Sequence, residues 1–198
     1  MVAMSENAKV KKLKVAWGIT GAGDKIAEIL QTMIELKKQS EDTVEIEVFL
    51  SKAADTMLKF YGLEAELRKN FAKVTLELNA NSPFLAAWLQ SGKYEFLLIA
   101  PASSNTVAKI ANSISDTMLT NAAIMSLKAY RPVYILPTDY REGTVLTKLP
   151  NGKEMKLRVR KEEADQVRKL EAMDGMHVFE SPQTMREGFL AWLKTVKS

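Results

Sequence analysis

Hydroxyl and amide side chains directly follow an apolar segment in the middle of the chain. Residues 97–100 are apolar and lead into Pro101-Ala102-Ser103-Ser104-Asn105-Thr106, after which an alanine-rich helix is expected. Two serine hydroxyls, an amide and free backbone N–H groups then meet at a helix N-terminus, where the helix dipole favours an anionic or polyhydroxylated ligand. Ordinary helix capping by serine or asparagine explains the same residues without a ligand. Other loops must decide between the two interpretations.

A glycine-rich loop follows the first expected strand, residues 13–17. Gly18-Ile19-Thr20-Gly21-Ala22-Gly23 opens a helix, and its glycines let the backbone come close to a ligand, while the helix N-terminus favours phosphate. The glycine spacing is GxxGxG and differs from the GxGxxG of dinucleotide-binding loops. A tight turn that binds nothing is the alternative.

The loop after the second expected strand, residues 44–50, also suits a phosphate. Ser51 and Lys52 follow this strand, and no acidic residue stands there to hold an adenine ribose. The three loops together favour a mononucleotide over NAD or FAD. FMN in particular would use a phosphate nest, hydroxyl partners for its ribityl chain and backbone groups for its ring edge.

These loops depend on strands and helices that alternate along the chain. Helical spacing of apolar residues separates apolar strands expected at 13–17, 44–50, 74–78, 96–100, 133–136 and 176–179. The alternation predicts an α/β fold, a three-layer, doubly wound parallel sheet with helices on both faces. Ligands of such sheets bind outside the carboxyl ends of the strands. A mostly helical segment is expected over 108–126, with an interruption near 113–115.

A β-hairpin insertion is expected at about 143–160, because Asn151-Gly152 stands between two alternating segments, 144–149 and 154–160. One face of the hairpin is apolar and the other is basic. Residues 143–161 carry six cations against Glu154 alone, in a chain whose net charge is +4. The basic face either attracts an acidic partner or is a solvated strand face whose lysines prevent edge pairing.

Composition limits the chemistry that the chain can perform. Its 198 residues, 46% hydrophobic, predict a single domain over 13–198 behind a frayed tail, 1–12. The absence of cysteine excludes disulfides, iron–sulfur ligation and a cysteine nucleophile, and His177 is the only histidine. Redox chemistry would need an organic cofactor or a partner. We expect no metal site, no membrane or nucleic-acid partner, and a cytoplasmic location.

Three motifs together closely resemble a known family. They are Trp17-Gly18-Ile19-Thr20-Gly21-Ala22-Gly23, the segment Ile99-Ala100-Pro101-Ala102-Ser103-Ser104-Asn105-Thr106 with its helix, and Ser115-Asp116-Thr117-Met118-Leu119-Thr120-Asn121. They resemble the FMN-binding flavoprotein superfamily of flavin-containing cysteine decarboxylases and flavin prenyltransferases, in particular its archaeoflavoprotein branch, which includes relatives of dihydromethanopterin reductase. The resemblance covers about residues 13–196. It implies a flavodoxin-like sheet in a homo-oligomer, with FMN near the subunit interfaces.

The resemblance also implies which residues bind FMN. Asn105 matches the asparagine beside the flavin, and Ser51 and Lys52 would lie near the phosphate. Asp116 and Thr120 are expected to shape the site or the interface. The cofactor-binding residues implied in this way are Thr20, Gly21, Ala22, Gly23, Ser51, Lys52, Pro101, Ala102, Ser103, Ser104, Asn105 and Thr106.

Departures from the family pattern bear on the reaction. The chain lacks the decarboxylases' histidine before the Pro-Ala-Ser strand and their cysteine, and it has Leu136-Pro137-Thr138-Asp139-Tyr140 where they have Pro-Ala-Met-Asn. We therefore expect electron transfer, assign no catalytic residue, and regard Asp139 and Tyr140 as candidates to flank the ring or a substrate.

The electron donor implied by the resemblance is ferredoxin or a similar acidic carrier, steered by Lys148, Lys153, Lys156, Arg158 and Arg160. The electron acceptor is not identified. The alternatives are an FMN-dependent dihydromethanopterin reductase, a prenyltransferase or decarboxylase relative, and a cofactor-free oligomeric scaffold.

Overall fold

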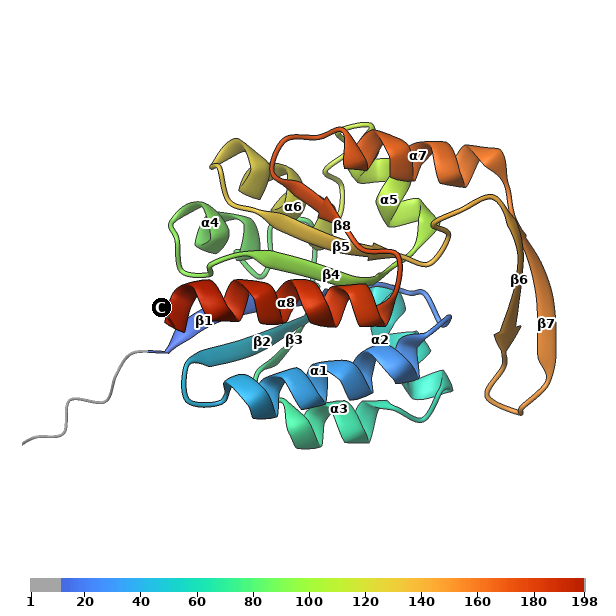
Figure 1. Ribbon diagram of the computed structural model, residues 1–198, viewed down its shortest axis with the longest axis horizontal. Coiled ribbons are helices and arrows are strands. Elements are labelled where there is room, and N and C mark those ends of the chain that lie inside the picture. The colour runs from blue at the N-terminus through green and yellow to red at the C-terminus, as the bar shows by residue number, and fades with distance from the viewer. Residues whose placement is uncertain (1–11, 198) are drawn as a thin grey trace, which may run out of the picture.

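The computed structural model describes residues 12–197, which form a parallel six-stranded sheet and a separate hairpin (Figure 1). Of the expected frayed tail, only Lys12 lies within the described residues. The order of the sheet is β3-β2-β1-β4-β5-β8. Its strands are β1 (Leu13–Ile19), β2 (Val44–Leu50), β3 (Val74–Leu76), β4 (Leu97–Ala102), β5 (Val133–Pro137) and β8 (Met176–Val178).

Helices cover both faces of the sheet, as the alternating pattern predicts. One apolar core lies between the sheet and α1 (Ile26–Ser40), α2 (Lys52–Phe60), α3 (Glu64–Asn70) and α8 (Pro182–Lys197). A second core lies on the opposite face, against α4 (Leu85–Gln90), α5 (Ser104–Ala111), α6 (Met118–Lys128) and α7 (Lys161–Glu171). The expected three-layer α/β fold is confirmed. None of the helices that the structure describes is both long and apolar enough to cross a membrane.

The first strand is longer than its sequence pattern indicates. We expected it to end at residue 17, but Gly18 and Ile19 continue the ladder, where Gly18 stands opposite Phe49 of β2 and Ile99 of β4. A Cβ at Gly18 would lie 2.6 Å from Leu119 Cδ2, so this glycine permits close packing of α6 on the strand. The loop therefore begins after Ile19. The helix α1 begins at Ile26, and the residue before it, Lys25, has a left-handed backbone with a φ of 57°.

The segment expected to be mostly helical over 108–126 is two helices with different starts. α5 begins at Ser104, because the Ser103 hydroxyl caps it by accepting a hydrogen bond from the backbone N–H of Thr106. α6 begins at Met118, where Thr117 and Thr120 form a capping box. Residues 112–117 separate the helices, in agreement with the interruption expected near 113–115.

The hairpin extends beyond the carboxyl ends of the sheet strands and is set apart from them (Figure 1). It consists of β6 (Gly143–Lys148) and β7 (Glu154–Val159), paired antiparallel with Val145 opposite Leu157. At its tip, Asn151 Oδ1 accepts a hydrogen bond from the N–H of Lys153, and Gly152 has a φ of 80°. The Asn-Gly turn and the register therefore agree with the pattern in the sequence.

Candidate functional site

The loops after β1 and β4 are held together by Thr20. Its hydroxyl donates to the carbonyl of Pro101 at 2.8 Å and accepts from the N–H of Ser103 at 2.8 Å. Its own N–H donates to the same Pro101 carbonyl at 3.2 Å. Because Thr20 is buried, this two-way pairing fixes the glycine loop against the start of α5.

The loop after β2 is joined to α6 by a buried carboxylate. Glu77, only 7% exposed, accepts from the N–H of Lys52 at 3.3 Å and from the N–H of Met118 at 2.8 Å. Ser51 caps α2 through a hydrogen bond from the N–H of Ala54 at 3.1 Å. One side chain thus bridges the N-termini of α2 and α6, where a negative charge also complements both helix dipoles.

A polar cleft of about 620 Å³ opens between these loops. Seven of the predicted residues line it: Thr20, Gly21, Ser51, Lys52, Ser103, Asn105 and Thr106. Asn105 is exposed, and no hydrogen bond occupies its side chain among the described residues. In the first turns of α2 and α5, the N–H groups of Ala53, Ser104 and Asn105 have no partner among the described residues, so backbone donors lie beside the hydroxyls and the amide of the cleft.

Two lysines, Lys52 and Lys109, and two carboxylates, Glu77 and Asp116, line the polar cleft. Lys109 Nζ lies 2.8 Å from Asp116 Oδ2, so this lysine is already paired. Lys52 is exposed and has no carboxylate partner within the part of the chain that the structure describes. Together with the helix N-termini, Lys52 gives the cleft its attraction for an anion.

Other predicted residues lie around a second cavity, the hairpin pocket. Ala22, Gly23, Ser103 and Ser104 line this pocket of about 340 Å³ together with residues of α2 and the hairpin. Ser103 lines both cavities, so they adjoin. Pro101 and Ala102 are buried in β4 and line neither, so their contribution is to the backbone framework through the Pro101 carbonyl.

Two glycines of the loop are explained by packing within the chain. A Cβ at Gly21 would lie 2.5 Å from Ala53 Cβ, and one at Gly23 would lie 2.6 Å from the Tyr61 ring. The loop therefore approaches the two ends of α2 more closely than a residue with a side chain would allow. The spacing of the glycines in the sequence did not indicate that the loop has to pack this closely against α2.

Several residues of the polar cleft were not predicted from the sequence. Glu77 is the most important of them, because its carboxylate accepts hydrogen bonds at the N-termini of two helices. In the sequence it looks like an exposed residue near the end of a short strand. Asp116 was expected nearby, and it does line the cleft, whereas Thr120 is fully buried in the α6 capping box. The other unpredicted lining residues are Ala53, Asn79, Ala80, Lys109, Thr117 and Leu119.

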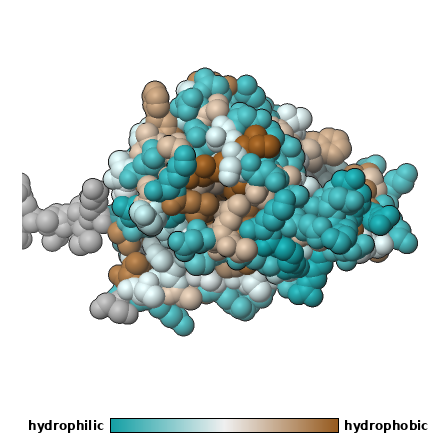
Figure 2. Space-filling view, turned by 90° about the horizontal axis from the view of Figure 1, so that it is seen from above, coloured by the Kyte–Doolittle hydropathy of each residue, from teal (hydrophilic) through white to brown (hydrophobic). Residues whose placement is uncertain are grey.

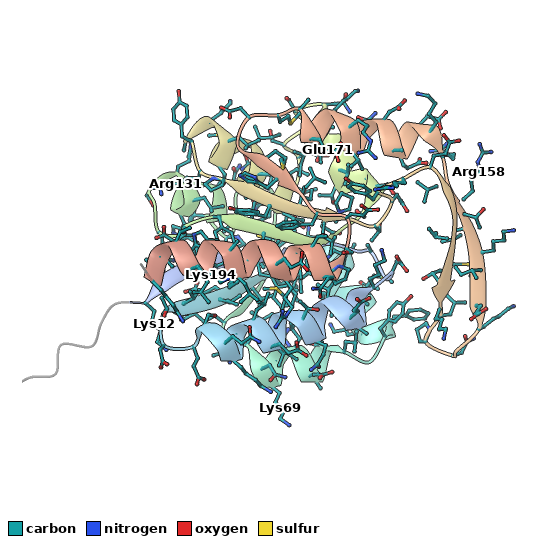
Figure 3. All side chains as sticks on the ribbon, viewed as in Figure 1. Lys12, Lys69, Arg131, Arg158, Glu171 and Lys194 are labelled. Atoms are coloured by element: carbon teal, nitrogen blue, oxygen red, sulfur yellow. The ribbon has the colours of Figure 1, made fainter. Side chains whose placement is uncertain are left out.

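The basic residues of the hairpin differ in their surroundings. Arg160 contacts Glu163 at the start of α7, and Lys148 stands opposite Glu154 in the ladder. Lys153, Lys156 and Arg158 are exposed and make no ion pair among residues 12–197. The hairpin surface is largely hydrophilic in Figure 2, and Figure 3 places Arg158 at the end of the hairpin near α7.

Tyr140 and His177 have partners away from the polar cleft. The Tyr140 hydroxyl donates to Glu171 at 2.7 Å, and this hydrogen bond raises the pKa of the tyrosine. His177 is exposed on β8 and stacks on Tyr134, with the ring centroids 4.7 Å apart. No group of three or more histidine, aspartate or glutamate side chains within the described residues could hold a metal ion.

A family model described as Flavoprotein matches residues 3–188. The chain belongs to the flavoprotein family. This flavoprotein is 41% identical over 185 residues to an uncharacterized protein of Methanocaldococcus jannaschii, with 93% of this chain and 98% of the relative covered. The resemblance inferred from the motifs is therefore confirmed.

Two further relatives carry functional names. The dihydromethanopterin reductase (acceptor) of Methanocaldococcus jannaschii is 38% identical over 145 residues, which cover 70% of this flavoprotein and 58% of that reductase. This flavoprotein therefore spans less than two thirds of the reductase that it matches. DmrB of Burkholderia xenovorans, solved in complex with FMN and described as a cubic protein cage for redox transfer, superposes with a TM-score of 0.80 and is 32% identical, with 96% of this chain and 99% of DmrB covered.

Proposed function

We propose that this flavoprotein binds FMN in the polar cleft and acts in electron transfer. FMN, when bound, exchanges one or two electrons with its partners. The observation that carries the proposal is the convergence of the loops after β1, β2 and β4 on one cleft of about 620 Å³, a volume within the range of small-molecule sites. The FMN complex of DmrB, a protein 32% identical to this chain, supports the choice of cofactor.

In this proposal, different residues of the cleft contact different parts of FMN. The Lys52 ammonium and the N–H of Ala53 face the phosphate, because among the described residues these donors at the start of α2 have no partner. The hydroxyls of Ser51, Ser103 and Thr106 serve the ribityl chain, and Asn105 offers its free amide to the ring. Ala22, Gly23 and Ser104 lie at the adjoining pocket.

Loss of the Lys52 charge tests the cofactor assignment. In titrations of FMN-free protein followed by flavin fluorescence, Lys52→Ala should weaken FMN binding about tenfold or more, since a charged hydrogen bond to phosphate contributes about 1.5–3 kcal/mol. The control is Lys69→Ala, because Lys69 projects from α3 outside both cavities (Figure 3). Wild-type protein that is colourless as purified and takes up no added FMN would refute the proposal.

Ferredoxin, or a carrier of similar acidity, is the electron donor in this proposal. The chain has no cysteine and so no iron–sulfur cluster of its own, and the exposed Lys153, Lys156 and Arg158 offer an acidic partner a basic surface. Reversing these three charges to glutamate should slow reduction by ferredoxin about tenfold at low salt and little at high salt.

A matched control carries three reversals at exposed lysines elsewhere: Lys38→Glu, Lys69→Glu and Lys128→Glu. It has the same net charge as the hairpin variant. Equal rates for the two variants would show that net charge alone matters and that the hairpin is not the docking surface.

A pterin reductase is the second candidate. It is favoured by the 38% identity to dihydromethanopterin reductase over 70% of this chain. Pterin-dependent reoxidation of the reduced protein, followed at the flavin absorbance, would support this reading. Reduction by ferredoxin without pterin turnover would support the electron carrier instead.

We also propose that the protein is a homo-oligomer with FMN near its subunit interfaces. Leu78 and Phe84 are each 65% exposed and flank Asn79 and Ala80, which line the polar cleft. A second copy that covers these apolar side chains would also cover the cleft. Light scattering of the purified protein should give a multiple of the 22.1 kDa chain mass, and Phe84→Asp should lower it.

A further inference from the structure

The loop after β5 is anchored on both sides of Asp139. The N–H of Thr138 donates to the carbonyl of the last residue of β4 at 3.0 Å. On the other side, the Tyr140 hydroxyl donates to Glu171 of α7 at 2.7 Å (Figure 3). Asp139 itself accepts a hydrogen bond from the Ser104 hydroxyl. Its carboxylate is therefore held at the first residue of α5.

The charge of Asp139 is not neutralised by an ion pair among residues 12–197, because its hydrogen-bond partner is an uncharged hydroxyl. Arg141 and Arg168, the cations of neighbouring segments, pair with other carboxylates. Asp139 lines the hairpin pocket together with a second carboxylate, Asp24, and no cation of the described chain lines that pocket. The negative charge of Asp139 therefore acts on whatever lies beside the start of α5.

The partner of Asp139 stands between two residues of the polar cleft. Ser104 is preceded by Ser103 and followed by Asn105, and both of these line the cleft. The N–H groups of Ser104 and Asn105 have no partner among the described residues, and by themselves they would favour negative charge on a bound ring. A carboxylate hydrogen-bonded at the same helix start works against this preference.

We propose that Asp139 lowers the reduction potential of FMN bound in the polar cleft, an inference that rests on the proposed function. Uptake of two electrons from the donor and one proton from the solvent adds one negative charge to the flavin ring. The charge of Asp139 opposes this added charge, whereas the uncharged oxidised ring is affected much less. Asp139 thus weakens the binding of reduced FMN relative to oxidised FMN and makes the reduced protein a stronger electron donor.

Redox titration of the FMN-loaded, full-length protein against a reference dye measures this effect. Asp139→Asn keeps the size of the side chain and an acceptor for Ser104, but it removes the charge. The variant should raise the affinity for reduced FMN about tenfold relative to oxidised FMN, which is a rise of about 30 mV in the two-electron potential. The Kd of oxidised FMN should change by less than about threefold.

Two control variants separate the charge of Asp139 from other consequences of substitution. Asp139→Glu retains the charge, so the ratio of the two FMN affinities should stay within about twofold of wild type. Glu142→Gln has the same net charge as Asp139→Asn, but Glu142 is exposed and lines neither cavity. Its affinity ratio should equal that of wild type.

An affinity ratio in Asp139→Asn within about twofold of wild type would overturn the inference, as would an equal rise in Glu142→Gln. An equal rise in Asp139→Glu would also overturn it, because packing and not charge would then be responsible. Titration of the same samples with oxidised FMN separates this failure from failure of the proposed function. Protein that binds FMN with an unchanged potential refutes only the role of Asp139, whereas protein that binds no FMN refutes the proposed function and this inference with it.

Discussion

Replacement of Glu77 by alanine should destabilise the fold through the starts of two helices. The carboxylate is 7% exposed and accepts from the N–H groups of Met118 at 2.8 Å and Lys52 at 3.3 Å. The shorter hydrogen bond contributes about 1.5–3 kcal/mol, because it joins a buried donor to a charge. The longer bond and the two helix dipoles add about 1 kcal/mol. The expected loss is therefore about 3 kcal/mol.

Urea unfolding of the FMN-free chain measures this loss. A change of about 3 kcal/mol is a large share of the 5–15 kcal/mol typical of a folded protein, and it corresponds to about 6–12 °C in Tm for a chain of this size. Glu77→Gln should lose about half as much, since the amide keeps one acceptor oxygen. Glu66→Ala is the control, because Glu66 is exposed on α3 and its carboxylate has no partner in the described structure.

If Glu77→Ala and Glu66→Ala both unfold within about 0.5 kcal/mol of wild type, the carboxylate does not hold the helix N-termini. The FMN affinity of the Glu77 variants is a second, independent test of the role of this carboxylate. Glu77→Gln removes a negative charge from the polar cleft, so the folded variant should bind FMN at least as tightly as wild type. Weaker binding would instead indicate a direct contact between Glu77 and the cofactor.

Two further predictions concern packing and pH. Gly21→Ala should lower the free energy of unfolding in urea by about 1–3 kcal/mol and weaken FMN binding, because its Cβ would lie 2.5 Å from Ala53 Cβ. Adding Ala53→Gly should restore much of the stability and of the FMN affinity. If the effects of the two substitutions on stability are simply additive, the contact is contradicted. Burial of Glu47 opposes its ionisation, but hydrogen bonds from Lys14, Tyr94 and Lys73 prevail and lower its pKa to about 2. Because the folded-state pKa is depressed, the stabilisation is present above about pH 4.5 and lost as the pH falls toward 2. Urea unfolding monitored by circular dichroism at a series of pH values should show that the free energy of unfolding falls by about 3 kcal/mol over this range. An equal fall in Glu47→Gln would contradict the assignment.

The sequence predicted the local elements well where one physical rule governed them. Continuous apolar strands between amphipathic helices led to the parallel sheet, and Asn151-Gly152 located the hairpin turn, because only a few residues tolerate positive φ. The error at β1 has a packing cause. Gly18 looked like the start of a loop, but it continues the strand and leaves room for Leu119 of α6. A contact between residues so far apart in the chain leaves no periodic signal.

By itself, the sequence determined which donor groups follow which strands, and therefore that the loops after β1, β2 and β4 would face one edge of the sheet. Only the tertiary structure decided how that edge is divided. Glu77 meets Lys52 and Met118, which lie 25 and 41 residues away, and the hairpin returns its apolar face toward α2. Those contacts form the polar cleft and the hairpin pocket as adjoining cavities, the first lined by charges of both signs and the second by carboxylates alone. Local propensity cannot encode this division, because it arises from side chains that meet only once the sheet has formed.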